Sequence, residues 1–171
     1  MEITLILDNI RSTYNVGAIL RTAEGFGVTE VIFSGYTPFP GEKPGVLPHI
    51  AEKLEKQIGK TALGAEKMVK CTFCSDIKEF LAEKSASGDT IIALENNILD
   101  SRLIRLSEVK QALNGIKRAY LIAGEEVSGI DSKLYPYISI FAEIPMQGQK
   151  ESFNVSVATG IALYELAKGA E

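Results

Sequence analysis

The sequence predicts an α/β fold with a mainly parallel sheet of about six strands and helices on both faces. Short apolar runs alternate along the chain with segments whose apolar residues recur at helical spacing. The runs are apolar throughout, without the polar alternation of a half-exposed strand, which is typical of strands covered on both faces. With 171 residues, the chain is long enough to form one domain with a substantial core.

The elements follow one another in a regular order. The expected strands are residues 3–7, 31–33, 71–74, 90–94, 119–123 and 138–141. The expected helices are residues 16–26, 48–57, 76–84, 107–113 and 155–166, with shorter helical turns at 61–69 and 131–134. The segment 34–48 carries four prolines and three glycines and is expected to be a loop.

Several helix ends carry sequence signals. Asn15 is the expected N-cap of the first helix, and Gly27 its expected stop. Pro48 is typical of a first helical position. Asp76 and Glu79 have the spacing of a capping box.

Composition excludes some classes of protein. Hydrophobic residues make up 46% of the chain and charged residues 23%, as in an ordinary globular protein. No apolar run reaches the roughly 18 residues of a membrane span, and the first residues do not resemble a signal peptide. We therefore expect a cytoplasmic protein with no membrane partner. The net charge of −4 argues against nucleic-acid binding by bulk charge alone, although it leaves room for a local basic patch.

The cysteines and the histidine do not predict a metal or redox site. Cys71 and Cys74 have C-x-x-C spacing but lie in a short strand-like run, without further ligands nearby. We interpret them as structural cysteines. His49, the single histidine, lies in the proline-rich region and is expected at the surface. No metal is expected.

The ligand site is expected at the carboxyl ends of the strands. The chain contains no G-x-x-x-x-G-K-[ST], and no G-x-G-x-x-G follows the first strand, which weakens ATP, GTP and NAD as ligands. Gly124, Gly129 and Gly148 would allow close backbone contact with a nucleoside that lacks phosphates, as in S-adenosylmethionine. The alternative is that these glycines only make turns.

Three stretches together carry a family resemblance. They are NVGAILRTA at residues 15–23, IAGEEVSG at residues 122–129, and IPM at 144–146 followed by SFNVSVA at 152–158. In order and at strand ends, they resemble the three motifs of the SpoU/TrmH RNA 2′-O-methyltransferases of the SPOUT superfamily. The resemblance covers nearly the whole chain.

The resemblance implies a fold, a cofactor and partners. It implies a C-terminal trefoil knot, a homodimer, S-adenosylmethionine bound in the knot, and an RNA substrate such as tRNA or rRNA. Many members carry an additional N-terminal RNA-binding domain, whereas here we expect residues 1–171 to be a single SPOUT domain without one. The cofactor-binding residues implied are Leu94, Ala123, Gly124, Ile144, Met146, Ser152 and Phe153.

The resemblance also implies catalytic residues. These are Arg21, Asn15, Glu126, Ser152 and Asn154. Arg21 is either the base that activates the ribose hydroxyl or a clamp on the RNA phosphate. We favour the clamp, supplied by the dimer partner, because a guanidinium keeps its proton up to a pKa above about 12. The structural alternatives are a helix cap for Asn15, an acceptor for backbone amides for Glu126, and a buried polar group for Asn154.

The sequence is also compatible with other functions. The chain could be a catalytically idle knotted dimer that binds cofactor or RNA, or a methyltransferase acting on a base nitrogen. A flavodoxin-like binder of another small molecule is the remaining alternative.

Overall fold

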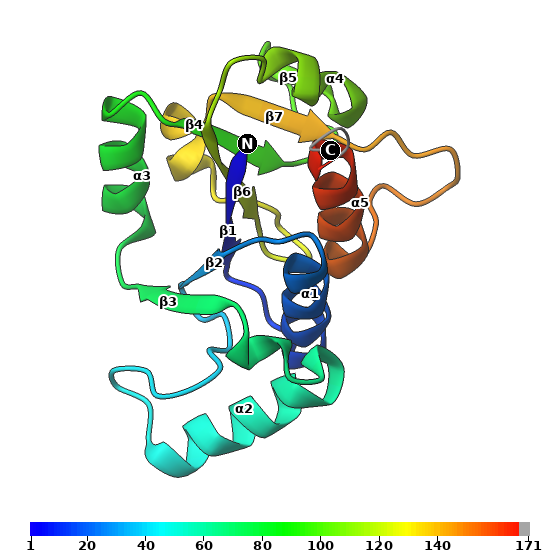
Figure 1. The fold of residues 1–171 in the computed structure, drawn as a ribbon. Helices are drawn as coiled ribbons and strands as arrows, with labels where there is room; N and C mark the ends of the chain where they lie inside the picture. Colours follow the sequence, from blue (N-terminus) through cyan, green and yellow to red (C-terminus); the bar gives the residue numbers. More distant parts are fainter. Residues whose placement is uncertain (168–171) are drawn as a thin grey trace.

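The computed structural model describes residues 1–167. They form a central parallel sheet with the strand order β3-β2-β1-β6-β4-β7-β5, and helices pack against it (Figure 1). The strands are β1 Glu2–Asp8, β2 Glu30–Ser34, β3 Lys70–Cys74, β4 Thr90–Leu94, β5 Leu103–Arg105, β6 Arg118–Ala123 and β7 Ile140–Glu143. The α-helices are α1 Thr13–Gly25, α2 Pro48–Ala62, α3 Ile77–Ala86, α4 Leu106–Ala112 and α5 Val155–Ala167. Two 3₁₀ helices, η1 Ala65–Lys67 and η2 Ser132–Tyr137, complete the set of described elements.

The predicted α/β architecture with a parallel sheet is confirmed, but the number of strands is corrected. The sheet has seven strands, and every pair in it is parallel. The strand missed in the sequence is β5, a three-residue edge strand that pairs with β7. It escaped prediction because it is short and partly exposed and ends on Arg105, so it lacks a continuous apolar run.

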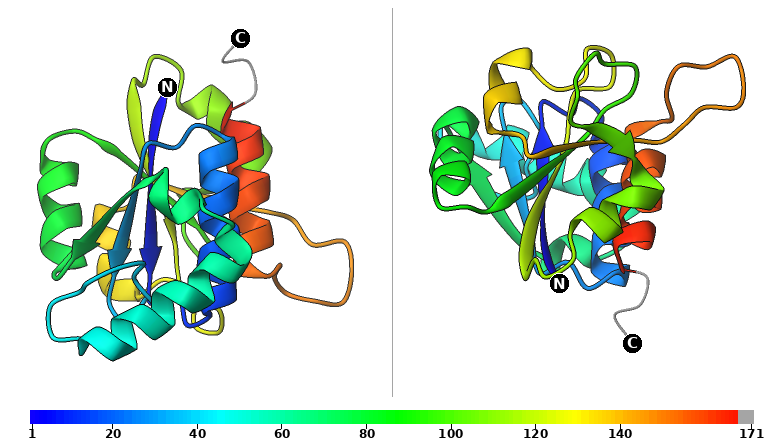
Figure 2. Two further views of the ribbon diagram at one scale, coloured as in Figure 1. Left: turned by 60° about the horizontal axis from the view of Figure 1, so that its bottom comes forward. Right: turned by 90° about the horizontal axis from the view of Figure 1, so that it is seen from above.

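Helices cover the sheet unequally on its two faces. The larger core lies under α1, α2, α4 and α5, and the smaller core lies under α3 and η2. Figure 2 shows α1 and α5 side by side, with the loop before α5 projecting away from the body of the molecule. No helix within residues 1–167 has the length and apolar character needed to span a membrane.

Two predicted helix starts have different outcomes. For α3 the N-cap half of the predicted capping box is confirmed, because the Asp76 carboxylate accepts a hydrogen bond from the Glu79 N–H at 2.9 Å. The prediction for α1 is wrong: its N-cap is Ser12, whose hydroxyl accepts from the Asn15 N–H at 3.2 Å. The side chain of Asn15 is instead engaged by residues distant in the sequence.

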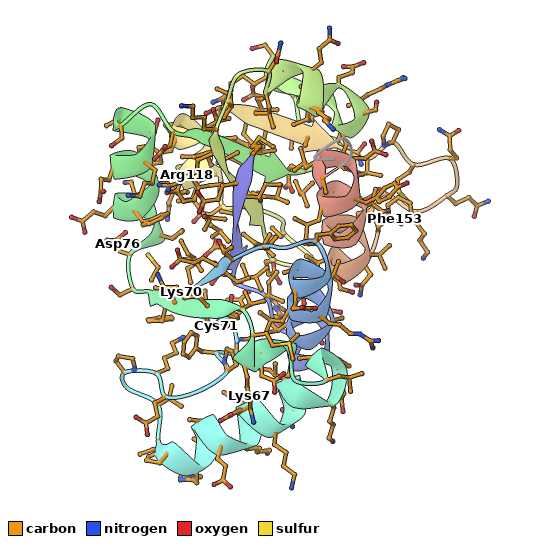
Figure 3. The ribbon with its side chains drawn as sticks, viewed as in Figure 1. Lys67, Lys70, Cys71, Asp76, Arg118 and Phe153 are labelled. Atoms are coloured by element: carbon orange, nitrogen blue, oxygen red, sulfur yellow. The ribbon has the colours of Figure 1, made fainter. Side chains whose placement is uncertain are left out.

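The two cysteines lie on opposite faces of β3, since side chains alternate along a strand. Cys71, labelled in Figure 3, packs against the larger core, and Cys74 packs against the smaller one. Both thiols are free, and burial raises the pKa of Cys71 to about 11. This arrangement separates the thiols and does not suit a shared disulfide or metal ion. Over residues 1–167, no group of three or more His, Cys, Asp and Glu side chains could hold a metal ion.

Gly17 permits the close packing of α1 on α2. A Cβ built at this position would overlap the Ile58 carbonyl oxygen and the Thr61 hydroxyl oxygen. The hydroxyl of Thr61 also donates to the carbonyl of Tyr14 at 3.0 Å, which fixes the end of α2 against the start of α1. Gly17 therefore positions the helix that begins at the strand-end loop.

We expect Gly17→Ala to lower the free energy of unfolding by about 2 kcal/mol or more, because the added methyl group meets backbone atoms of α2. Urea denaturation measures the change. Gly25→Ala is the matched control in the same helix, since nothing lies within 4 Å of its added Cβ. The control should leave stability unchanged or raise it by up to about 1 kcal/mol. Equal effects of the two substitutions would contradict the packing explanation.

Candidate functional site

A cavity of about 310 Å³ opens at the carboxyl ends of β4, β6 and β7. This volume is at the lower end of the range of about 300–1,000 Å³ that is typical of small-molecule sites. Four stretches of the chain form its lining: residues 94–97, residues 123–129, Ala142 with Ile144, and Glu151, Ser152, Phe153, Val155 and Ala158. The cavity therefore lies where ligands bind in open α/β sheets.

Most of the residues predicted to bind a cofactor meet at this cavity. The predicted residues that line it are Leu94, Ala123, Gly124, Ile144, Ser152 and Phe153. Met146 is half-buried but lies outside the lining. Figure 3 shows Phe153 beside α5, where the projecting loop joins the helix.

Asn96 holds the base of this projecting loop. Its side-chain amide accepts from the Ile144 N–H at 3.1 Å and donates to the Ile144 carbonyl at 3.0 Å, so it continues the pairing of β4 with β7. It also donates to the carbonyl of Glu151 at 3.3 Å, as does Asn97. Both ends of the segment 144–151 are thereby attached to the end of β4. The sequence marks Asn96 only as a polar residue after a strand.

Two glycines in the lining are required by close packing. A Cβ at Gly124 would lie 2.7 Å from the carbonyl carbon of Gly129 and from a side-chain carbon of Ile130. Gly129 has a φ of +70°, and a Cβ there would overlap the carboxylate of Glu95. The segment after β6 can therefore fold back on itself beside the end of β4.

A chain of hydrogen bonds joins three of the predicted catalytic residues. The Glu126 carboxylate accepts from the N–H groups of Arg11 at 3.0 Å and Ser12 at 3.3 Å, and from the side chain of Asn15 at 3.1 Å. Asn15 in turn accepts from the side-chain amide of Asn154 at 3.2 Å. Burial alone would raise the pKa of Glu126, but these N–H donors together lower it. The carboxylate therefore stays ionised at neutral pH.

Asn154 completes the chain at the start of α5. Its side-chain oxygen accepts from the N–H of Ser156 at 2.9 Å and from the Ser156 hydroxyl at 2.7 Å. The same side chain thus caps α5 and contacts Asn15 of α1. Ser152, the remaining predicted residue of this segment, is exposed at the cavity.

Arg11 and Glu125 form a neighbouring ion pair that the sequence analysis did not identify. The Arg11 guanidinium lies 2.6 Å from the Glu125 Oε1, and the Glu125 side chain is only 6% exposed. The hydroxyl and N–H of Ser128 donate to the other carboxylate oxygen and, together with Arg11, lower the pKa of Glu125. Only the three-dimensional structure brings Arg11 next to Glu125, so no local pattern in the sequence could have shown the pair.

Arg21 lies apart from the other predicted catalytic residues. It is exposed on α1 and makes no hydrogen bond or ion pair with Asn15, Glu126, Ser152 or Asn154 among the described residues. One copy of the chain therefore brings together the amide and carboxylate groups but not the guanidinium.

Glu95 is a half-buried carboxylate in the wall of the cavity. Burial raises its pKa to about 7, and a long hydrogen bond from the Ile130 N–H, 3.4 Å, offsets this only in part. It directly follows the predicted strand 90–94 and lies outside the three motif stretches.

The chain belongs to the SpoU rRNA Methylase family, whose model matches residues 2–164. A 23S rRNA (guanosine-2'-O-)-methyltransferase, RlmB, from Xylella fastidiosa is 29% identical over 164 residues, covering 96% of this chain and 57% of that protein. The tRNA (guanosine(18)-2'-O)-methyltransferase of Escherichia coli is 26% identical over 166 residues, covering 96% of this chain and 62% of that protein. The chain thus spans less than two thirds of the length of these relatives.

Solved structures share the fold. The A. aeolicus TrmH/SpoU tRNA modifying enzyme has a TM-score of 0.75 at 26% identity, covering 98% of this chain and 74% of that chain. An AdoMet-bound rRNA methyltransferase from Sinorhizobium meliloti has a TM-score of 0.76 at 22% identity, covering 99% of this chain and 57% of that chain. The resemblance identified from the three motifs is therefore confirmed at the level of family and fold.

We expect Glu126→Gln to lower the free energy of unfolding at neutral pH by about 1–3 kcal/mol, as measured by urea denaturation. The amide has one acceptor oxygen instead of two, and it brings N–H groups toward the N–H donors of Arg11, Ser12 and Asn15.

The pH dependence gives the control. Because the folded-state pKa of Glu126 is lowered, its contribution is fully present above the unfolded pKa of about 4.3. This contribution to stability is lost as the pH falls through the folded pKa. The free energies of unfolding of the unaltered protein and of Glu126→Gln should therefore converge between about pH 5 and about pH 3. An equal loss in Glu24→Gln, an exposed position on α1, would attribute the effect to net charge instead.

Proposed function

We propose that this protein is an RNA ribose 2′-O-methyltransferase that uses S-adenosylmethionine (AdoMet) and acts on tRNA or rRNA in the cytoplasm. The observation that carries the proposal is the hydrogen-bond chain from Glu126 through Asn15 to Asn154 beside the cavity. It joins the three family motifs, which are distant in the sequence, at one edge of the sheet. The names of the rRNA and tRNA relatives support the reaction and the substrate class.

The cavity suits this cofactor. Its wall combines apolar side chains, including Leu94, Ile144 and Phe153, with polar groups of the segment 124–129, a mixture that suits a nucleoside. In the part of the chain that the structure describes, no lysine, arginine or histidine lines the cavity, so this lining does not suit a polyphosphate. When bound, S-adenosylmethionine supplies a methyl group already activated on a sulfonium.

The protein's part in the reaction is alignment and charge stabilisation. Asn154 is held by Asn15, which Glu126 fixes in turn, so the amide at the start of α5 has a defined orientation. We propose that Asn154 and Ser152 orient the substrate ribose at the mouth of the cavity. Positioning of this kind supplies several kcal/mol of the barrier reduction, up to about 7–11 kcal/mol in the best cases.

Arg21 is proposed as the clamp on the RNA phosphate. A guanidinium binds a phosphate through two parallel hydrogen bonds and stabilises the developing alkoxide. In a single copy Arg21 is exposed and unattached to the other catalytic residues, which supports its donation to the site of a second copy.

A homodimer is therefore part of the proposal. α5 carries an exposed apolar face with Val157 at 49% and Tyr164 at 53% exposure. The ring of Tyr164 lies 6.3 Å from that of Phe26 at the end of α1, so the face continues onto the helix that carries Arg21. We propose that a second copy covers this face and that the C-terminal segment is threaded as a trefoil knot. The attachment of the 144–151 loop by Asn96 supports the threading.

We expect Arg21→Lys to lower kcat for RNA methylation roughly a hundredfold while leaving the Kd for S-adenosylmethionine unchanged, because lysine keeps the charge but loses the fork of donors. Labelled cofactor and total RNA, followed by nuclease digestion, measure the product as 2′-O-methyl nucleosides. Near-normal turnover would remove Arg21 from the mechanism.

The same digest separates the alternative functions. Unaltered protein that binds the cofactor but yields no methylated nucleoside would favour an idle dimer, and methyl groups found on bases would favour a base-nitrogen methyltransferase. Absence of cofactor binding in calorimetry would favour a different small-molecule binder.

We expect Val157→Asp to convert the dimer into monomers, because it places a charge in the apolar face on α5. Light scattering coupled to size-exclusion chromatography measures the mass. Leu99→Asp, which alters a fully exposed apolar residue elsewhere, is the control and should stay dimeric. A monomeric unaltered protein at micromolar concentration would contradict the proposed dimer.

A further inference from the structure

We propose that Glu95 determines specificity in the cofactor cavity, where its charge favours the cationic cofactor over the neutral product left after methyl transfer. This inference rests on the proposed function and concerns the same cavity. It assigns a role to a side chain that lies outside the three family motifs.

The charged side chains described in the cavity lining are all acidic. Among residues 1–167, four glutamates line the cavity, Glu95, Glu125, Glu126 and Glu151, and no lysine, arginine or histidine does. A ligand with net positive charge is therefore favoured over a neutral ligand of the same shape.

The other three carboxylates are compensated in different ways. Glu125 is paired with the guanidinium of Arg11 at 2.6 Å. Glu126 accepts three hydrogen bonds from N–H donors around the start of α1. Glu151 is exposed on the projecting loop, where water screens its charge.

Glu95 has neither a countercharge nor full exposure. It forms no ion pair among the described residues, and the one hydrogen bond it accepts, from the Ile130 N–H, is long at 3.4 Å. It is held between the end of β4 and Gly129, where even a Cβ would collide with its carboxylate. Its burial without a partner is also what raises its pKa to about 7. Glu95 therefore retains acceptor capacity and charge that a ligand in the cavity can satisfy.

The chemistry of the reaction changes the ligand's charge. The bond between the methyl carbon and sulfur breaks, its electron pair stays on sulfur, and the methyl carbon bonds the ribose oxygen, whose proton is released. S-adenosylmethionine carries a sulfonium, an ammonium and a carboxylate, for a net charge of +1, whereas S-adenosylhomocysteine has no net charge. Apart from the transferred methyl group, the two molecules differ only in this charge, which the carboxylate of Glu95 distinguishes.

Isothermal titration calorimetry tests the inference with three probes, S-adenosylmethionine, S-adenosylhomocysteine and sinefungin. Sinefungin carries an amine in place of the methylated sulfonium and is therefore also cationic. We expect the unaltered protein to bind both cations more tightly than S-adenosylhomocysteine. Glu95→Gln should lower the Kd ratio of S-adenosylhomocysteine to S-adenosylmethionine about tenfold, chiefly by weakening binding of the cations.

The pH dependence of the unaltered protein is a second test that needs no variant. As the pH rises from about 6 to about 7.5, Glu95 ionises, so the Kd ratio should rise, and it should stay flat in Glu95→Gln. The titratable groups around Glu95 are Tyr135 of η2 and the lining residues Glu125, Glu126 and Glu151. Burial and, after it, the charges of Glu95 and Asp100 raise the pKa of Tyr135. The pKa values of Glu125 and Glu126 are lowered, so neither titrates in this window.

Glu143→Gln is the matched control. It makes the same change of net charge at the end of the neighbouring strand β7, outside the cavity lining. An unchanged ratio in a folded Glu95→Gln, an equal effect in Glu143→Gln, or a ratio in the unaltered protein that does not vary with pH would each overturn the inference and leave the proposed function standing. Failure of the unaltered protein to bind S-adenosylmethionine at all would instead overturn the proposed function.

Discussion

The site depends on the hydrogen bonds that the carboxylate of Glu126 accepts. It follows β6, yet the groups that it binds follow β1, and through Asn15 it reaches the start of α5 after β7. In a parallel sheet the carboxyl ends of all strands meet at one edge, so segments more than a hundred residues apart become neighbours. Removing a partly buried carboxylate with three N–H donors costs more stability than the sum of its hydrogen bonds, because those donors would be left without an acceptor.

Much of the fold could be predicted from the sequence because its physical causes are local. The strand cores are continuous apolar runs, and the capping aspartate of α3 is three residues from the amide that it accepts from. The prediction fails where tertiary contacts override local preference. Asn15 has the properties of a helix cap, but Glu126 and Asn154 engage its side chain, and Ser12 caps the helix instead. Likewise, β5 exists because β7 offers an edge to pair with.

In the candidate site, too, features encoded locally could be predicted and features that depend on tertiary contacts could not. The three motif stretches could be recognised because each is contiguous, and the topology then brings two of them to the cavity and the third beside it. The supporting contacts could not be recognised in the same way. Asn96 pairs with backbone groups 48 residues away, and Arg11 pairs with Glu125 across the sheet edge. Such contacts leave no period or spacing in the sequence, so only the folded chain reveals them. The steric role of Gly17 against α2 is equally invisible without the helix that it touches.

The geometry of α1 supports the proposal that the enzyme uses two copies of the chain. Asn15 and Arg21 lie on one helix, six residues apart. At about 1.5 Å and 100° per residue, their Cα atoms are separated by about 9 Å along the axis and by about 120° around it. Asn15 is turned toward Glu126 and Asn154, so Arg21 points elsewhere, toward the exposed side of the molecule. In a single copy, the phosphate clamp and the ribose-orienting amide therefore start from different sides of α1. In the dimer that we propose, the apolar face of α5 and the end of α1 would meet their counterparts, and each arginine would approach the other copy's cavity.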